Sequence, residues 1–535
     1  MHFTLGTRTR PLASVPARLF AGFLAILVLL AILPQCAATQ EVQESATLPD
    51  HERQLLEKID RLERRVAELE ARAGISSSPT QPDPVSTTKA TAVVATKQPS
   101  AATSAADSSS TSTTEAAAPF AFADFTWLNG NSRTKDSPLD SKVFTGEFRA
   151  DISYIYDFNH PQDHTLSGAS ESGRTGEFQV QQLGVGGDFH YGNVRGRLMT
   201  QLGLYSTMTP RNDASPGRGQ WNLADAYRYL SEAYGGYHFN VLHGINLDAG
   251  IFMSYVGLFS YYNFDNWAYQ PSYVSSNTPW FFNGIRVQIF PTEKLKIEPW
   301  LVNGWQSYGV FNGRPGGGMQ VLWRPNGAVS ILSNSYLLGQ DTLGAPHRTR
   351  YHSDDSIQVK YYDNPARFLD KAAFSLTLDA GCESGSGVSC FGDSKEGPKQ
   401  AFLGGMLYNR FWFHKDLYAF TLGGGGITNP GRYLVLLPPI NGATAFSGTP
   451  YFTLNPGDQF KAWDASTTFD YMPSQFVTFR FEYDHRAANV PYFAGPGGIT
   501  PPGGNVGAAG SLVPGFFPDL RKRENRFNLA LLVKL

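Results

Sequence analysis

The residues of this sequence most able to do chemistry are charged side chains that recur at every second position. Arg480, Glu482 and Asp484 alternate with aromatic residues, and Asp464 and Asp470 lie in a similar pattern a little upstream. Successive side chains of an extended strand point to opposite faces, so such a segment presents one charged face and one apolar face. A face that is charged along its whole length predicts contact with water.

In each predicted strand, the residues at the same alternate positions as the charged ones are candidates for the face in contact with water. Opposite charges segregated on facing walls would create a transverse field that orients dipolar solutes. The alternative, favoured for any single residue, is that the charges form salt bridges between strands and only stiffen and hydrate the wall. The pore-lining candidates are Arg149, Asp151, Arg195, Arg197, Glu232, Asp248, Arg286, Lys296, Glu298, Asp464, Asp470, Arg480 and Glu482.

Enzymatic motifs are sparse in this sequence. It contains no His-Glu-x-x-His, Gly-x-Ser-x-Gly or Gly-x-x-x-x-Gly-Lys-Ser/Thr motif, and no Cys-x-x-Cys pair. Asp484-His485 is the adjacent pair singled out as a candidate site of a barrel hydrolase, but a structural or lumen role is favoured. We therefore predict no enzyme activity, no cofactor and no metal.

Two long connections have unusual compositions. The segment 255–282 is rich in Phe, Trp and Tyr, and it is either a constriction loop folded into a pore or, as favoured, part of an aromatic girdle at the outer interface. The span 491–518 is rich in Gly and Pro, which predicts either a mobile lid or an inert surface loop.

The elements that must position these residues are strands. Alternation alone also suits a soluble sandwich. The charged faces, together with short turns that alternate with long connections, instead predict an all-β transmembrane antiparallel barrel of about 16 strands. Fourteen or eighteen strands remain alternatives. The predicted strands begin near residues 144, 176, 194, 230, 246, 281, 295, 317, 328, 356, 371, 401, 417, 460, 476 and 524.

Composition excludes several classes of protein. The net charge of −2 argues against a nucleic-acid partner, which requires a dense basic surface. Mean hydropathy is −0.26, and after residue 40 no apolar run reaches the roughly 20 residues of a membrane-spanning helix. All but three of the aromatic residues lie after residue 119, which fits a barrel with aromatic girdles.

The first 142 residues divide into four parts. Residues 1–38 resemble a signal peptide cleaved after Ala38, with lipidation of Cys36 as the less favoured alternative. Residues 39–74 hold a short coiled-coil helix, and residues 75–119 form a Ser/Thr/Ala/Pro-rich linker that we predict to be disordered. Residues 120–142 are a lead-in to the barrel at 143–535.

The coiled-coil segment predicts a homo-oligomer, a dimer by its heptad pattern or a trimer as is common for such barrels. The alternative is an amphipathic helix packed on the barrel. Of the three cysteines, only Cys382 and Cys390 would remain after cleavage. They lie close together in a Gly/Ser-rich loop, so a disulfide is plausible in an oxidising compartment.

Several short stretches resemble a known family. Leu230-Ser231-Glu232-Ala233-Tyr234, Asn283-Gly284-Ile285-Arg286 and Val302-Asn303-Gly304-Trp305 resemble the OmpL-like β-barrel porins, the porin-2 group. The stretch Asp124–Gly130 and the Asp-rich strand at 464–470 resemble the same group, so the resemblance covers roughly residues 120–535. It implies a passive outer-membrane pore with no defined catalytic residues. One departure is the C-terminus, Leu535, where many barrels have Phe.

Together these patterns predict an outer-membrane porin that passes small hydrophilic solutes, with the coiled coil and linker in the periplasm. The expected partners are outer-membrane lipid, small hydrophilic solutes, further copies of the chain and, through the coiled coil, the cell wall. A structural tether or adhesin is the main alternative, and a barrel-embedded hydrolase is less favoured.

Overall fold

The fold comes from a computed structural model. It describes Arg64 and residues 118–535, apart from 170–171, 393–396, 432, 435 and 450–458. The chain divides into two compact units, 1–108 and 109–535, and the account below concerns the second. The predicted signal peptide, coiled coil and nearly all of the linker lie outside the described residues.

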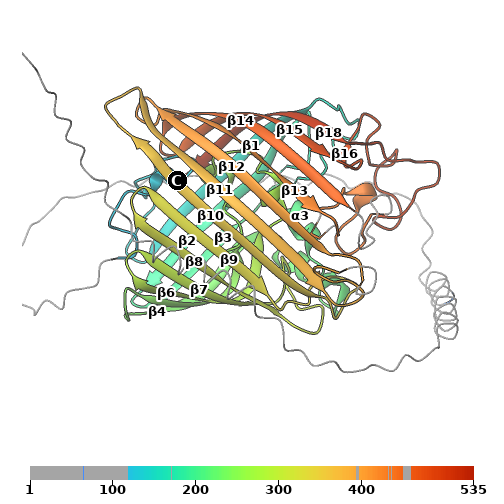
Figure 1. The fold of residues 1–535 in the computed structure, drawn as a ribbon, viewed down its shortest axis with the longest axis horizontal. Helices are drawn as coiled ribbons and strands as arrows, with labels where there is room; N and C mark the ends of the chain where they lie inside the picture. The colour runs from blue at the N-terminus through green and yellow to red at the C-terminus, as the bar shows by residue number, and fades with distance from the viewer. Residues whose placement is uncertain are drawn as a thin grey trace, which may run out of the picture. The chain divides into compact units, whose positions relative to one another are not determined.

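Sixteen antiparallel strands form one closed barrel, which confirms the predicted fold class and strand number (Figure 1). Every strand pairs with its neighbour in sequence, and the last strand pairs with the first. Closure leaves no unpaired strand edge, as a barrel in lipid requires. The barrel strands are β1 Phe144–Asp157, β2 Phe178–Tyr191, β3 Val194–Thr200, β4 Leu230–Phe239, β5 Ile245–Met253, β6 Phe281–Thr292, β7 Leu295–Val302, β8 Gly316–Asn326, β9 Val329–Leu337, β10 Thr349–Asp363, β11 Leu369–Ser384, β12 Ala401–Phe413, β13 Tyr418–Asn429, β14 Phe460–Ser474, β15 Val477–Ala488 and β18 Arg523–Lys534.

The remaining elements are short and lie in the connections. They are η1 Thr126–Leu128, α3 Tyr205–Met208, η2 Pro210–Asn212, η3 Ser215–Gly217, α4 Leu223–Tyr227, η4 Asn263–Asp265, α5 Tyr273–Ser276, η5 Ile440–Gly442, and the two-stranded sheet of β16 Phe493–Ala494 and β17 Leu520–Arg521. None of the helices in the described residues is long and apolar enough to span a membrane.

Connections alternate between the two ends of the barrel. At one end, which we call the short-turn end, turns such as 192–193 and 327–328 join consecutive strands. At the other, the long-loop end, connections such as 201–229 and 489–522 are far longer. This rhythm is the one that the sequence predicted, and it is typical of outer-membrane barrels.

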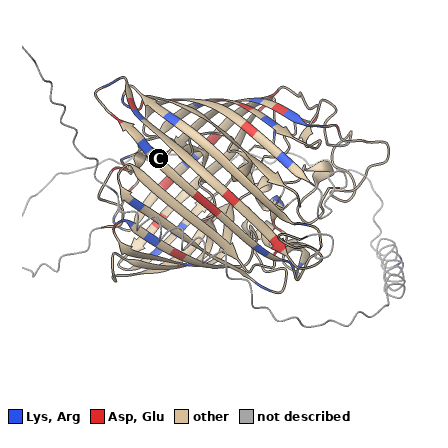
Figure 2. Cartoon of the chain, in the orientation of Figure 1, with Lys and Arg blue, Asp and Glu red and all other residues tan. Residues whose placement is uncertain are grey.

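The two faces of the wall differ as the alternation predicts. In β15, Phe479, Phe481 and Tyr483 point outward and are 39%, 42% and 44% exposed, whereas the inward Arg480 and Glu482 are 1% and 0% exposed. Charged positions recur along the strands, as Figure 2 shows. An apolar outer face matches hydrocarbon, because lipid cannot solvate charged groups.

One predicted strand boundary is wrong. Fifteen strands begin within two residues of the predicted positions, but β10 begins at Thr349 rather than near residue 356. Its first half reads Thr-Arg-Tyr-His-Ser-Asp-Asp, in which the outward Ser353 and Asp355 are as polar as the inward residues. Alternation of apolar and polar residues is absent there, so the pattern predicted a loop.

If the outer face of the wall contacts lipid, replacing an outward aromatic residue by a charged one should destabilise the barrel. We expect Phe481→Lys to lower the free energy of unfolding by about 2–4 kcal/mol, because a lysine near mid-depth faces lipid. The measurement is denaturant unfolding of the barrel in liposomes. Phe517→Lys, in an exposed loop, is the matched control. Equal stability of both variants, or a folded protein that dissolves without detergent, would contradict a membrane-embedded wall.

Candidate functional site

The interior of the barrel is occupied by the connection between β5 and β6, residues 254–280, which we call the lumen loop. Its helix α5 contacts β12, β13 and β14. These strands lie on the opposite side of the barrel from β5 and β6 in the strand order, so the loop crosses the lumen. Of the two interpretations of this aromatic segment, the girdle at the outer interface is therefore wrong. The segment is folded into the barrel, as the constriction-loop interpretation requires.

Carboxylates of the wall accept hydrogen bonds from the backbone of the lumen loop. Glu482 on β15 accepts from the amides of Tyr269 and Gln270, each at 2.6 Å. Asp464 on β14 accepts from the Tyr273 amide at 2.9 Å and from Ser272 Oγ at 2.8 Å. For a carboxylate buried in this way, hydrogen bonds from backbone N–H groups replace part of the hydration that burial removes.

Arginines of the same wall donate to carbonyl groups of the loop. Arg480 donates to the carbonyls of Asn263, Asn266 and Ala268 at 2.9, 2.6 and 3.1 Å. Arg410 on β12 donates to the Trp267 carbonyl at 3.2 Å. Asp470 lies between the two guanidinium groups and pairs with each at 2.7 Å.

The prediction that this charged face contacts water is therefore wrong at β14 and β15. Arg410 and Asp470 are both 0% exposed. Asp470 accepts from Arg410 and Arg480, and Arg410 also donates to Thr421 Oγ1 and to the Trp267 and Gly130 carbonyls, in aromatic surroundings. Trp267 of the loop meets Trp412 of β12 edge-on, with ring centroids 5.6 Å apart, in a cluster that also includes Trp127.

Strands β1 and β18 hold the tip of the lumen loop. Asp265 forms ion pairs with Arg149 at 2.7 Å and with Lys534 at 3.3 Å. Burial by itself would raise the pKa of Asp265, but the two cations outweigh it and hold the pKa at about 2. Asp151 accepts from Asn263 Nδ2 and Tyr269 OH, both at 2.9 Å.

The remaining candidates form a network on the β1–β7 wall. Arg197 pairs with Glu147, Asp188 and Glu232 at 2.7–2.8 Å. Positive and negative side chains alternate within this one wall and do not face each other across the lumen. This arrangement fits salt bridges between strands and not a transverse field. The other pairs are Arg195–Asp248 at 3.2 Å, Arg286–Asp248 at 3.0 Å and Lys296–Glu298 at 2.7 Å.

This wall differs from β14 and β15 in its access to solvent. The side chains of Asp188 and Arg195 are 49% and 29% exposed, although both point to the inward face with their partners. All pore-lining candidates thus point into the barrel, but they fall into two groups. Most of those on β14 and β15, with Arg149 and Asp151 of β1, bind the lumen loop. Those on β3–β7 pair mainly with each other, and Glu232 among them also accepts from Tyr262 OH of the loop at 3.0 Å.

The lead-in contributes to the lumen in a way that the sequence did not reveal. Trp127 Nε1 donates to the Gly327 carbonyl at 3.0 Å, and the Gly130 amide donates to the Asp265 carbonyl at 2.9 Å. Arg410 also donates to the Gly130 carbonyl at 2.6 Å. A Cβ on Gly130 would lie 2.4 Å from the carbonyl oxygen of Asn266, so only glycine permits this approach.

Aromatic residues of the lead-in also cover cations near the short turns. The guanidinium of Arg324 lies 5.0 Å from the ring of Phe120 and 4.5 Å from that of Phe125, and Lys294 lies 4.9 Å from Phe122. The available signal was the cluster of aromatic residues that begins at Phe120, directly after a linker with none.

A cavity of about 280 Å³ remains between the lead-in, the lumen loop and the inward face of β8–β11. Gln320, Ser330, Gln358 and Ser375 line it from the strands, and Phe259 and Trp267 line it from the loop. Its polar groups include these amides and hydroxyls, which bind uncharged polar groups or water, and the charged side chains of Arg324 and Asp265.

The family profile described as "Putative beta-barrel porin-2, OmpL-like" matches residues 149–512. The chain belongs to this family. A comparison with curated proteins gives no match.

Solved structures similar to this porin include three outer-membrane proteins at 10–12% identity. OprB of Pseudomonas putida and an anion-selective porin of Comamonas acidovorans each have a TM-score of 0.42, and the matches cover 73% of this chain and 94% and 99% of theirs. The channel DcaP of Acinetobacter baumannii has a TM-score of 0.40, covering 74% of this chain and 96% of its own.

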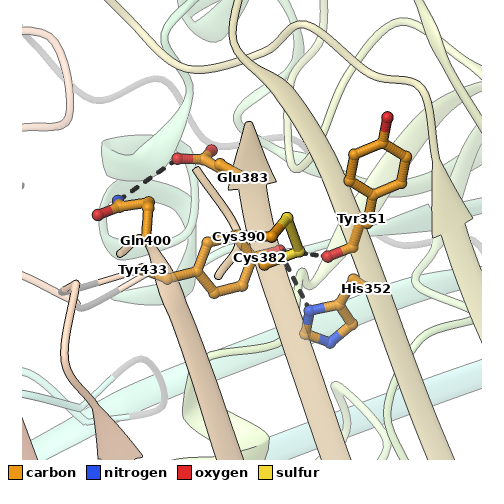
Figure 3. Close-up of a disulfide and its surroundings, with 7 residues drawn as sticks. All are labelled: Tyr351, His352, Cys382, Glu383, Cys390, Gln400 and Tyr433. Carbon is orange, nitrogen blue, oxygen red and sulfur yellow. Dashed lines mark hydrogen bonds between the residues drawn. A yellow bond between two sulfur atoms is a disulfide. The ribbon is translucent and has the colours of Figure 1, made fainter. Parts of the chain in front are cut away.

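A disulfide joins the two cysteines that the sequence analysis paired (Figure 3). Cys382 is near the end of β11 at the long-loop end of this porin, and Cys390 lies in the connection that follows. Next to it, Glu383 accepts from Gln400 Nε2 at 3.4 Å, and Tyr433 OH lies 3.3 Å from His352 Nδ1. The disulfide closes a small loop at the rim.

The residues considered for catalysis are not brought together. Asp484 points inward and accepts from Asn528 at 2.6 Å, whereas His485 points outward, where it contacts Asn525 at 2.8 Å and packs on Trp463. The two side chains lie on opposite faces of the porin wall and cannot share a proton. Within the described ranges, no cluster of His, Cys, Asp and Glu is arranged to hold a metal ion.

The low pKa of Asp265 gives a pH prediction. Its folded pKa of about 2 lies below the ordinary 3.8, so its contribution to stability is present above about pH 4 and is lost as the pH falls through about 2. We expect the mobility of a spin label on the lumen loop to stay constant between about pH 4 and 7.

Asp265→Asn should instead loosen the loop at every pH above about 4 and lower the free energy of unfolding there by about 2 kcal/mol, because Arg149 and Lys534 lose this ion pair. A mobility transition between about pH 5 and 7 that survives in Asp265→Asn would assign the titration to another group.

Proposed function

We propose that this outer-membrane channel is a diffusion porin, which passes small hydrophilic solutes through a lumen narrowed by the lumen loop. The observation that carries the proposal is the asymmetric filling of the barrel. The loop and the lead-in pack against β12–β15, whereas Asp188 and Arg195 of the β2–β7 wall stay accessible to solvent. The proposed passage follows this accessible wall.

The charge distribution of that wall favours weak selectivity. Each cation that we place along the passage has an acidic neighbour within 3.2 Å. Paired charges keep a wall hydrated, while their fields cancel over a few ångströms. Solutes would then be selected mainly by size, through the space that the lumen loop leaves free.

What the sequence predicts for the N-terminal segments remains a prediction. Cleavage after Ala38, a periplasmic coiled coil and a contact with the cell wall all concern residues outside those that the structure describes. A tether or adhesin would act through the coiled coil together with the long loops, and no described observation favours it over the porin.

Removal of the narrowing element tests the porin proposal. In planar bilayers we expect discrete single-channel steps from the full protein, and larger steps after residues 261–276 are replaced by a short Gly/Ser linker. The same replacement of residues 501–510, in the connection between β15 and β18, should leave the conductance unchanged. A folded wild-type barrel that never conducts would exclude an open pore, and unchanged steps after loop removal would exclude the loop as the constriction.

We propose further that the porin is a homo-oligomer, and that β9 and β10 face a second copy. Asp355 lies on the outward face of β10 and accepts from Ser333 Oγ at 2.5 Å and Ser353 Oγ at 3.0 Å. With Ser335, these residues form a polar patch between the apolar outward residues Met319 and Leu378. A carboxylate that faces lipid is costly, and a neighbouring polar surface removes that cost.

The variant Asp355→Leu distinguishes a patch that is covered by a second copy from a patch that faces lipid. If a second copy covers the patch, native mass measurement in detergent should show a shift from oligomer to monomer. If the patch faces lipid, the oligomeric state should stay the same and the barrel should become more stable. Thr428→Leu, an exposed outward position on β13, is the control for an added apolar side chain.

A further inference from the structure

A second cavity, of about 520 Å³, lies among the connections at the long-loop end, and we call it the vestibule cavity. Its walls come from four connections that are far apart in sequence, those between β1 and β2, β3 and β4, β13 and β14, and β15 and β18. A solute that approaches from the long-loop end would meet it before the lumen loop.

Three arginines line this cavity, Arg174, Arg211 and Arg228. The one carboxylate in the lining, Asp213, is buried and fully engaged elsewhere. It accepts from the amide and hydroxyl of Ser215 at 3.0 and 2.7 Å and from Ser307 Oγ at 2.9 Å. The lining therefore carries an excess of positive charge.

Arg174 and Arg228 have acidic partners, but N–H donors of their guanidinium groups remain available to a ligand. Arg174 and Arg228 pair with Glu177 and Asp225, which lie outside the lining; Asp225 is 63% exposed, and such pairs are weak in water. Arg228 Nε is buried and has no hydrogen-bond partner.

Arg211 is the least compensated of the three. Among the described residues, no carboxylate oxygen lies within 4.0 Å of its guanidinium, and burial lowers its pKa. A guanidinium that loses hydration without gaining an acid is a strong site for an anion, because it offers a planar fork of donors.

The uncharged part of the lining is mixed: Thr and Asn residues contribute polar groups, and several side chains are apolar. Leu166, Leu204, Met208 and Phe446 contribute side chains to the same cavity. Small inorganic anions gain nothing from such a wall, whereas an organic anion buries its hydrocarbon part there.

We propose that the vestibule cavity binds organic carboxylates, with the carboxylate on Arg211 and the hydrocarbon part against Met208 and Phe446. This inference rests on the proposed porin function, since it names a class of solute that is concentrated at the entrance of the passage. A fixed positive site at the mouth of a pore raises the local concentration of anions and the rate at which they enter.

Hexanoate is a suitable probe, with hexylammonium as the cationic counterpart of equal chain length and acetate as the short carboxylate. In planar bilayers, we expect hexanoate to reduce the single-channel current at lower concentration than acetate does, and hexylammonium to have no such effect. Arg211→Gln should raise the half-blocking concentration of hexanoate about 10-fold, the effect of one charge-assisted hydrogen-bonded pair.

Arg218→Gln is the matched control, because it removes the same charge from an exposed position of the same connection, outside the cavity lining. Equal half-blocking concentrations in the wild type and in Arg211→Gln, or equal block by hexylammonium, would overturn the proposal. Equal block by acetate would overturn the role of the apolar wall.

Calorimetric titration of hexanoate into the detergent-solubilised protein keeps this result separate from the porin proposal. If the wild type never conducts but hexanoate binds and Arg211→Gln weakens binding about 10-fold, the porin proposal fails and the binding site stands. If the protein conducts and hexanoate does not bind, the binding site fails alone.

Discussion

The interior of this barrel depends on the need to satisfy buried charge without water. Arg410, Asp470 and Arg480 lie on the inward face of adjoining strands and are almost fully buried. An ion pair alone does not repay the desolvation of such groups, so further hydrogen bonds are required. The lumen loop provides them through backbone carbonyls and amides, whose positions are fixed by the chain and not by side-chain rotamers.

The same constraint explains why the barrel has two kinds of interior wall. On the β12–β15 side, charges are dry and bind the loop, and aromatic rings fill the space between. On the β2–β7 side, charges pair mainly with each other, and Asp188 and Arg195 among them are partly exposed to solvent. The proposed passage and a packed interior would therefore share one barrel, with the lumen loop between them.

The sequence predicted the wall well because membrane strands carry a period of two that needs no tertiary information. It failed at β10, where Ser353 and Asp355 remove the contrast between the faces. The lumen loop could not be placed, because aromatic residues suit an interfacial girdle and a packed interior equally, and only contacts with residues some 200 positions away, such as Tyr269 with Glu482, decide between them. Ile155, the exception to the alternation of β1, is explained by the same loop: it points inward and packs in a cluster with Phe264 and Tyr269.

The position of Asp265 has a consequence for how the protein is assembled. The first and last strands of the chain meet at a single seam, and this carboxylate is bound by one cation from each side of it, Arg149 from β1 and Lys534 from β18. The tip of the lumen loop thus connects β1 and β18 through these two ion pairs. Its contact with Lys534 forms only when the final strand of the chain is in place, so this ion pair stabilises the closed barrel and not an open intermediate.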